Sequence, residues 1–151
     1  MIRVLIADDH AILRRGLAEI ISEAGDMEVC AEAATGAQTV KLARDHAIDV
    51  VLLDISMPDR NGLDTLKQLK KEKPKLAVLM LSMHLEEMYA LRAIKAGASG
   101  YLNKQSAPAQ LVVAFATLGL LYLLGWRAAH RARGAAAWAI VIGGALAAAA
   151  L

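Results

Sequence analysis

The chain has 151 residues, of which 57% are hydrophobic and 21% charged, and its formal net charge is +2. That length fits one domain with a sizeable core and a short appendage. The single cysteine, Cys30, excludes an intrachain disulfide, and its place in an apolar run predicts a buried structural thiol. We expect a reducing, cytoplasmic setting, with no secretory signal ahead of the first strand.

Charge is distributed unevenly along the chain. All 15 acidic residues lie at or before Glu87, and after Lys104 the charged side chains are Arg127, Arg131 and Arg133. The front of the chain is therefore close to neutral and the tail is purely basic. This change of character predicts a boundary between two unlike parts.

Apolar runs alternate with amphipathic stretches over the front part. A strand is predicted at residues 2–7, and the next segment places Leu13, Leu17 and Ile21 at helical spacing. The other predicted elements, in chain order, are strand 27–33, helix 36–46, strand 49–53, helix 62–73, strand 76–81, a helix from about Leu85 to Gly97, strand 100–102 and a helix from about Ser106. Alternation of this kind predicts an α/β fold with a parallel sheet covered on both faces.

Acidic residues end two of the predicted strands. Asp8 and Asp9 follow the first strand, and Asp54 follows the third. Open α/β sheets bind ligands at the carboxyl ends of their strands, so these acids predict a site at that edge. Crowded carboxylates repel one another unless a cation lies among them, and a set of oxygen ligands favours Mg²⁺. We predict Asp9 and Asp54 as Mg²⁺ ligands, with Asp8 in support.

The acids belong to a longer pattern, which continues with Met57-Pro58, Gly62, Ser82 and Lys104. These separated motifs resemble the receiver domain of two-component response regulators. The sequence at residues 4–10 and 96–104 is similar to the branch whose full-length members carry a C-terminal LuxR-type helix-turn-helix. The resemblance covers residues 1 to about 113 and implies a doubly wound, flavodoxin-like sheet of five strands in the order 2-1-3-4-5.

The resemblance implies phosphorelay signalling rather than an enzyme that acts on other molecules. Asp54 is implied as the phosphoacceptor, attacking as a carboxylate nucleophile. The backbone carbonyl of Ser56 is implied as a further Mg²⁺ ligand, and Ser82 and Lys104 as groups that bind phosphoryl oxygens. Tyr101 is implied as a switch residue that moves with Ser82, although an aromatic residue in a short strand equally predicts ordinary packing.

Two flanking residues and two partners also follow from the resemblance. Ser56 and His84 each lie two residues past a key group, at positions that tune phosphoryl lifetime in the family. A sensor histidine kinase is the expected partner, and a receiver dimer is an open alternative to a monomer. Because no second His or Cys stands at ligand spacing, His10 and His84 are predicted as loop histidines rather than metal ligands.

Simpler and competing interpretations stay open for the acids. Asp8 and Asp9 can cap the first helix, and Asp54 can belong to a turn. Aspartyl-nucleophile phosphohydrolases have a related sheet, but they place a second Asp two residues after the nucleophile, where this chain has Ser56. A membrane-tethered adaptor that uses the fold only for binding is a third interpretation, which the complete set of acids disfavours.

The tail is hydrophobic. We predict a receiver domain at residues 1–117 and a hydrophobic helical extension at residues 118–151. Residues 105–126 and 134–151 are free of charge, and each run is near the length that crosses a bilayer. The tail therefore either associates with a membrane through residues 111–151 or stems from a frameshift or fusion after about Leu111. Its composition offers no polar recognition helix, so specific binding to DNA is not expected.

Overall fold

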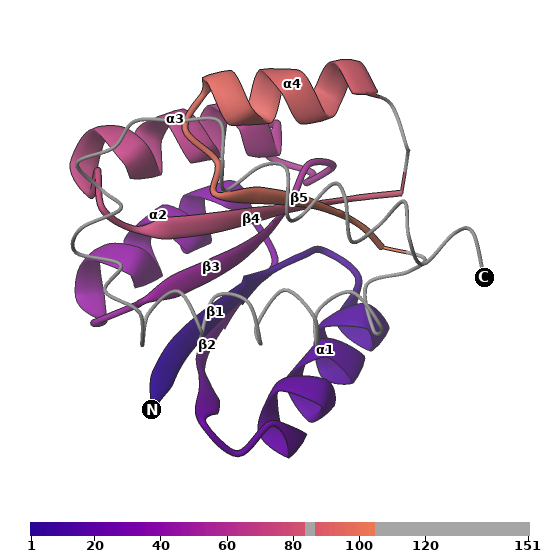
Figure 1. Ribbon diagram of the computed structural model, residues 1–151, viewed down its shortest axis with the longest axis vertical. Coiled ribbons are helices and arrows are strands. Elements are labelled where there is room, and N and C mark those ends of the chain that lie inside the picture. The colour runs from indigo at the N-terminus through magenta and orange to yellow at the C-terminus, as the bar shows by residue number, and fades with distance from the viewer. Residues whose placement is uncertain (84–86, 105–151) are drawn as a thin grey trace. The chain divides into compact units, whose positions relative to one another are not determined.

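Strands and helices alternate along the chain in the structure, a computed structural model that describes residues 1–83 and 87–104 (Figure 1). The described elements are β1 (Ile2–Ala7), α1 (Ala11–Glu23), β2 (Met27–Ala33), α2 (Gly36–Asp45), β3 (Val50–Asp54), α3 (Gly62–Glu72), β4 (Ala77–Ser82), α4 (Glu87–Lys95) and β5 (Gly100–Asn103). The predicted alternation is thus confirmed. The helix predicted from about Ser106 lies outside the described residues.

The five strands form one parallel sheet in the order β2-β1-β3-β4-β5. This is the order implied by the resemblance, and it confirms the flavodoxin-like fold class. Among the described helices, α2, α3 and α4 cover one face of the sheet and α1 lies on the other (Figure 1). The chain reverses its direction of winding between β1 and β3, which is where such sheets bind ligands.

The core lies on both sides of the three central strands. Every residue of β3 and of β4 is buried, as expected for parallel strands covered by helices on both faces. Toward α2, α3 and α4, the buried cluster includes Leu53, Met80 and Leu66. Toward α1, Leu17 and Ile21 supply the buried helix face. Each such side chain contributes about 1.5–3 kcal/mol of transfer free energy.

The edge strand β2 departs from a regular ladder and carries Cys30. The register between β1 and β2 shifts between Val4 and Leu5. The Cys30 thiol donates to the Val4 carbonyl at 3.4 Å, and partial burial raises the pKa of that thiol. The thiol was predicted to be buried, but Cys30 is only half-buried because it lies on an edge strand.

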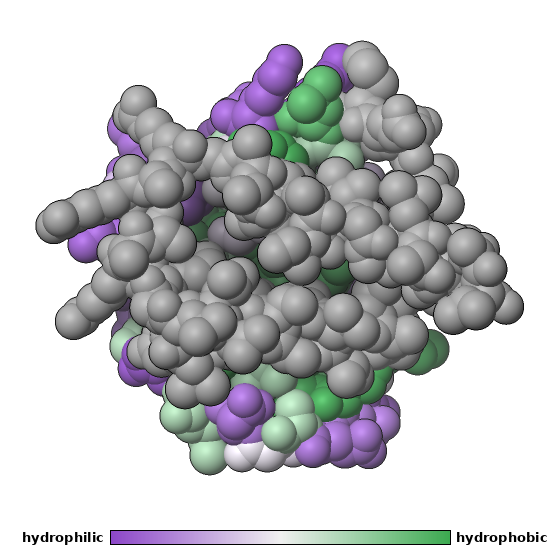
Figure 2. Space-filling view, viewed as in Figure 1, coloured by the Kyte–Doolittle hydropathy of each residue, from purple (hydrophilic) through white to green (hydrophobic). Residues whose placement is uncertain are grey.

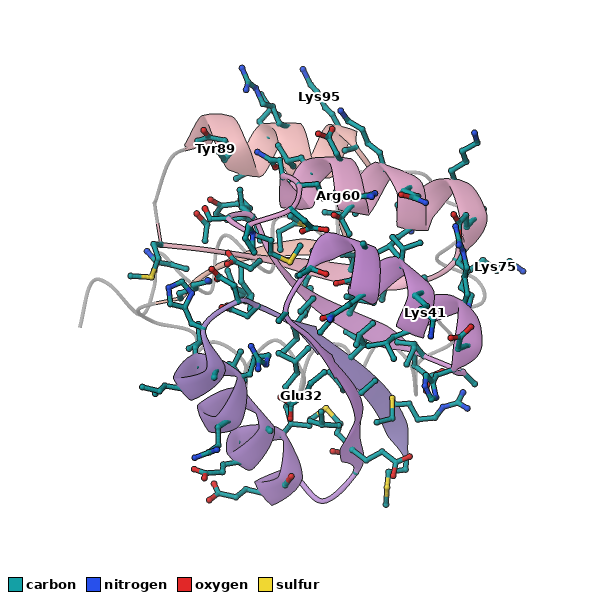
Figure 3. All side chains as sticks on the ribbon, turned by 180° about the vertical axis from the view of Figure 1, so that it is seen from behind. Glu32, Lys41, Arg60, Lys75, Tyr89 and Lys95 are labelled. Atoms are coloured by element: carbon teal, nitrogen blue, oxygen red, sulfur yellow. The ribbon has the colours of Figure 1, made fainter. Side chains whose placement is uncertain are left out.

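The outer faces of the helices carry charged side chains. Lys75 and Lys95 project outward (Figure 3), and Lys41 is exposed on α2. The upper edge of the space-filling view shows hydrophilic surface beside hydrophobic surface (Figure 2). In residues 1–83 and 87–104, no helix combines the length and apolar character that a bilayer span requires. The runs on which the predicted membrane association rests lie outside these residues.

Candidate functional site

Strand register brings the two acidic strand ends together. β1 pairs with β3 so that Ala7 lies opposite Leu53, which places Asp8 and Asp54 side by side just beyond that pair. β4 and β5 end at the same edge, with Ser82 opposite Asn103. Lys104 follows β5 directly, and its backbone N–H donates to the Ser82 carbonyl at 2.8 Å. The predicted meeting of these residues at one sheet edge is therefore seen.

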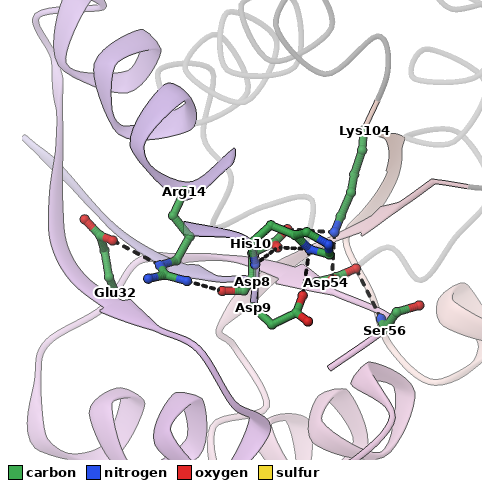
Figure 4. Close-up of polar contacts among 8 residues, drawn as sticks. All are labelled: Asp8, Asp9, His10, Arg14, Glu32, Asp54, Ser56 and Lys104. Carbon is green, nitrogen blue, oxygen red and sulfur yellow. Dashed lines mark hydrogen bonds and ion pairs between the residues drawn. The ribbon is translucent and has the colours of Figure 1, made fainter. Parts of the chain in front are cut away.

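Lys104 bridges two buried carboxylates. Its Nζ atom lies 2.7 Å from Asp8 Oδ2 and 2.7 Å from Asp54 Oδ2 (Figure 4). Asp8 is 0% exposed, Asp54 1% and Lys104 6%. Apart from this ammonium group, the described residues offer neither Oδ2 atom a hydrogen-bond donor. Two buried negative charges therefore share one positive charge.

Asp54 has a raised pKa. Burial is the main cause, and it outweighs the Lys104 ammonium and the Ser56 backbone N–H, both of which lower the pKa. That N–H donates to Asp54 Oδ1 at 3.2 Å. Asp54 is the last residue of β3, so the sheet positions its backbone and Asp54 is not a turn residue.

Asp9 and His10 form the exposed side of the cluster. His10 Nδ1 lies 2.7 Å from Asp9 Oδ1 and 3.1 Å from Asp8 Oδ1. The His10 backbone N–H also donates to Asp8 Oδ1, at 2.8 Å. Neither Asp caps α1, because its N-cap residue is His10. The prediction of His10 as an ordinary loop histidine missed this contact, and its position directly after two acids was the available signal.

The loop from β3 to α3 holds Ser56 beside Asp54. Ser56 forms an isolated antiparallel bridge with Asn61, and the Gly62 N–H donates to the Ile55 carbonyl at 2.8 Å. A Cβ on Gly62 would lie 2.0 Å from the Asp54 carbonyl oxygen. The glycine is therefore needed for α3 to begin against the backbone of Asp54.

Ser82 lies at the same edge, whereas Tyr101 lies two residues before the end of β5. Ser82 ends β4 and is 5% exposed. Tyr101 is partly buried against the core and lies opposite Met80 in the sheet, a placement that suits packing. Its role as a switch stays a prediction. His84 lies outside the described residues.

Arg14 is a neighbour of the site that the sequence interpretation did not single out. One guanidinium nitrogen donates to the Asp8 carbonyl at 2.7 Å, and Nε donates to Glu32 at 3.2 Å (Figure 4). This chain of contacts ties α1 and β2 to the end of β1. The sequence offered little indication of the role of Arg14, because an arginine at this position is typical of the polar face of an amphipathic helix.

The cluster has the composition of a divalent cation site. Ligand atoms from Asp8, Asp9, His10 and Asp54 all lie within 4.8 Å of one another. The three carboxylates exceed the single Lys104 ammonium in charge, and two of their buried oxygens have no hydrogen-bond donor beyond that ammonium among the described residues. The residues present therefore fit Mg²⁺, which prefers carboxylate oxygens.

Comparison with protein families identifies the domain. A model of the response regulator receiver domain matches residues 4–116. The chain belongs to this family. Receivers of response regulators are generally non-enzymatic signalling domains of two-component systems, and this membership supports a general role in phosphorelay signalling.

The receiver is similar to regulators of the predicted branch. It is 38% identical to response regulator UvrY of Escherichia coli over 114 residues, which are 76% of this chain and 52% of UvrY. It is 38% identical to the oxygen regulatory protein NreC of Staphylococcus epidermidis over 117 residues, which are 77% of this chain and 54% of NreC. The chain thus spans about half the length of these curated relatives.

A solved structure supports the same assignment. The crystal structure of a LuxR-family two-component response regulator from Aurantimonas superposes with a TM-score of 0.73 at 34% identity. The match covers 77% of this chain and 83% of that one. The family, its LuxR-type branch and the fold predicted from the sequence are therefore confirmed.

Proposed function

We propose that this receiver accepts a phosphoryl group on Asp54 from a sensor histidine kinase in a Mg²⁺-dependent reaction. The observation that carries the proposal is the setting of Asp54. Its carboxylate is buried at the sheet edge, in contact with Lys104 through one oxygen and with the Ser56 N–H through the other. The same edge collects Asp8 and Asp9, as a phosphoryl transfer site requires.

Four residues would hold the metal ion. Asp9 and Asp54 supply carboxylate oxygens, Asp8 supports them, and the Ser56 backbone carbonyl is the further ligand. When bound, Mg²⁺ supplies positive charge that offsets repulsion between Asp54 and the oxygens of the incoming phosphoryl group. Without it, the excess negative charge of the cluster opposes the approach of a phosphate donor.

The transfer replaces one bond to phosphorus with another. An oxygen of Asp54 bonds to phosphorus while the phosphorus–nitrogen bond of the donor phosphohistidine breaks, and the imidazole nitrogen keeps that electron pair. The Lys104 ammonium, already against Asp54 Oδ2, pairs with a phosphoryl oxygen. The Ser82 hydroxyl donates a hydrogen bond to another phosphoryl oxygen, and Tyr101 moves with Ser82. The added phosphoryl charge thereby changes the conformation of the receiver surface.

Neighbouring residues set the lifetime of the product. Ser56 is exposed beside Asp54, where its side chain can affect the approach of water to the acyl phosphate. We assign His84 the same task, from its sequence position two residues after Ser82. An exposed serine in place of a second Asp also argues against an aspartyl-nucleophile phosphohydrolase.

The partners and setting follow from this chemistry. We propose that the receiver acts in the cytoplasm, receives phosphate from a sensor histidine kinase, and passes the signal on through its surface, with a receiver dimer as one form of output. UvrY and NreC are longer proteins, so their own outputs are not transferred to this chain.

Phosphorylation with and without metal tests the proposal. Incubation with acetyl phosphate or a phosphorylated kinase should add the mass of one phosphoryl group when Mg²⁺ is present, and none after chelation by EDTA. The variant Asp54→Asn should gain nothing. Asp64→Asn, which changes an exposed carboxylate on α3, is the matched control and should be labelled like the parent. Equal labelling of Asp54→Asn would refute the assignment.

A further inference from the structure

His10 occupies the N-cap position of α1, but its side chain does not cap the helix. As the N-cap residue it makes no side-chain hydrogen bond to the first turn, although capping is the usual task at that position. Its imidazole instead turns toward the acidic cluster (Figure 4). The side chain is 66% exposed, so burial does not force this orientation.

The spacing of His10 from the acids matches that of neighbouring ligands on one metal ion. Nitrogen and oxygen ligands lie about 2.0–2.2 Å from a divalent ion such as Zn²⁺, so two ligands are about 3 Å apart at a right angle and about 3.4 Å apart in a tetrahedral site. His10 Nδ1 lies 2.7 Å from Asp9 Oδ1 and 3.1 Å from Asp8 Oδ1. Asp54 completes the group within 4.8 Å. One ion can therefore contact the imidazole together with the carboxylates.

Two buried oxygens support a cation at this place independently of His10. Apart from the Lys104 ammonium, which both atoms contact at 2.7 Å, Asp8 Oδ2 and Asp54 Oδ2 have no hydrogen-bond donor within the described residues. The surplus negative charge beside the imidazole is the electrostatic condition for binding a divalent ion.

A plain ion pair is the competing explanation for the position of His10. The exposed contact between His10 and Asp9 contributes about 0–1 kcal/mol, as an ion pair when the imidazole is protonated or as a hydrogen bond from Nδ1–H when it is neutral. Such a pair would have no preference among metal ions. The choice of metal therefore separates the two explanations.

We propose that His10 is a nitrogen ligand of this site and tunes it toward late first-row ions such as Co²⁺ and Zn²⁺ relative to Mg²⁺. Imidazole suits these ions, whereas Mg²⁺ prefers oxygen. The inference rests on the proposed function, because it adds a ligand to the cation site on which phosphoryl transfer depends. It assigns metal selectivity to a residue outside the oxygen ligands.

Calorimetric titration of the full chain with Co²⁺ and, separately, with Mg²⁺ tests the proposal. The variant His10→Asn replaces the ring nitrogen with an amide at the same reach. Its Kd for Co²⁺ should rise roughly tenfold, the size of effect seen when a supporting group at a metal site is lost, while its Kd for Mg²⁺ stays nearly constant. The visible absorption bands of bound Co²⁺ should change as well. His46→Asn, at the exposed C-cap of α2, is the matched control and should change neither Kd.

The outcomes separate this inference from the proposed function. If His10→Asn keeps the parental ratio of Co²⁺ to Mg²⁺ affinity, His10 is not a ligand, while the Mg²⁺ site and the phosphoryl transfer stand. If the parent binds neither ion, the metal-dependent function and the His10 ligand both fail.

Discussion

At the scale of single residues, burial disfavours the charged form of the Asp54 carboxyl group. Burial raises its pKa despite the Lys104 ammonium and the Ser56 N–H. The folded protein therefore keeps Asp54 protonated to a higher pH than the unfolded chain does. Above the folded pKa the ionised group costs stability, and below the ordinary aspartate pKa that cost disappears.

We predict that Asp54→Asn stabilises the metal-free protein by about 1 kcal/mol at pH 7. Asparagine keeps the shape of the side chain and removes the buried charge. The gain should shrink as the pH falls to about 4 and below, where the parent carboxyl group is protonated. Urea denaturation in EDTA at several pH values measures the effect. A variant less stable than the parent at pH 7 would contradict the electrostatic account.

The Lys104 ammonium partly neutralises the Asp54 carboxylate. Removing this ammonium should therefore destabilise the metal-free protein, whereas Asp54→Asn stabilises it. Lys104→Met leaves Asp8 and Asp54 buried without a cation, and losing one partner of a buried pair costs about 3–5 kcal/mol. Urea denaturation in EDTA should show that loss, and added Mg²⁺ should recover part of it. Lys67→Met is the matched control, because Lys67 pairs with Asp64 at the surface and its loss should cost less than about 1 kcal/mol. Equal losses in the two variants would show that Lys104 does not neutralise the site.

At the scale of elements, the start of α3 against β3 fixes the loop that carries Ser56. Gly62 allows this approach, because a Cβ there would lie 2.0 Å from the Asp54 carbonyl oxygen. Gly16 in α1 offers the opposite case, with nothing within 4 Å of the Cβ position. The same substitution at these two glycines therefore separates backbone crowding from helix propensity.

We predict that Gly62→Ala destabilises the fold by about 3 kcal/mol or more, since the backbone must move. Gly16→Ala should stabilise it by up to about 1 kcal/mol, because alanine is the better helix former. Thermal unfolding of both variants measures the contrast. If Gly62→Ala unfolds at the parental temperature, the close approach of α3 to Asp54 is not a constraint on the fold.

The same loop also stabilises the start of α2. Asp59 accepts hydrogen bonds from the Gly36 and Ala37 N–H groups, each at 2.8 Å. Burial raises the pKa of Asp59, but these and other backbone N–H groups outweigh it, so the net pKa is lowered. The stabilisation is therefore complete above the ordinary aspartate pKa and is lost as the pH falls through the lowered folded pKa.

We predict that Asp59→Ala costs about 1–2 kcal/mol at pH 7, the usual value of a helix N-cap. The difference from the parent should narrow below about pH 4, where the aspartate begins to protonate. Asp45→Ala, at the other end of α2, serves as the control and should change stability by less than about 0.5 kcal/mol. A pH-independent loss would mean that the Asp59 charge is not what holds α2.

The elements were predictable because their signals are local. Apolar runs and helical spacing set the positions of β1 to β5, and the acids at strand ends indicated the site. The Asp59 contact with α2 depends on tertiary placement, which residue spacing does not encode. The contact of His10 with Asp9 is local, and the position of His10 directly after two acids was its signal. The register shift beside Val4 likewise arises from pairing between strands.

At the scale of the whole molecule, the described receiver residues agree with the family in the order of elements and in the strand order of the sheet. The strand order was predicted from the family resemblance. The alternation of strands and helices could not predict it, because that alternation fits parallel sheets with several different strand orders. The family match ends at residue 116. The predicted division at residues 117 and 118 and the nature of the hydrophobic tail stay predictions, because residues 105–151 lie outside the described part.

The central claim is that Asp54 itself carries the phosphoryl group. Reduction of the phosphorylated protein with sodium borohydride converts an acyl phosphate of aspartate to homoserine, and peptide mass spectrometry then locates the changed residue. We predict homoserine at position 54, dependent on Mg²⁺ and on the phosphodonor. Homoserine at Asp8 or Asp9 with Asp54 unchanged, or none at all in protein that has gained a phosphoryl mass, would contradict the account.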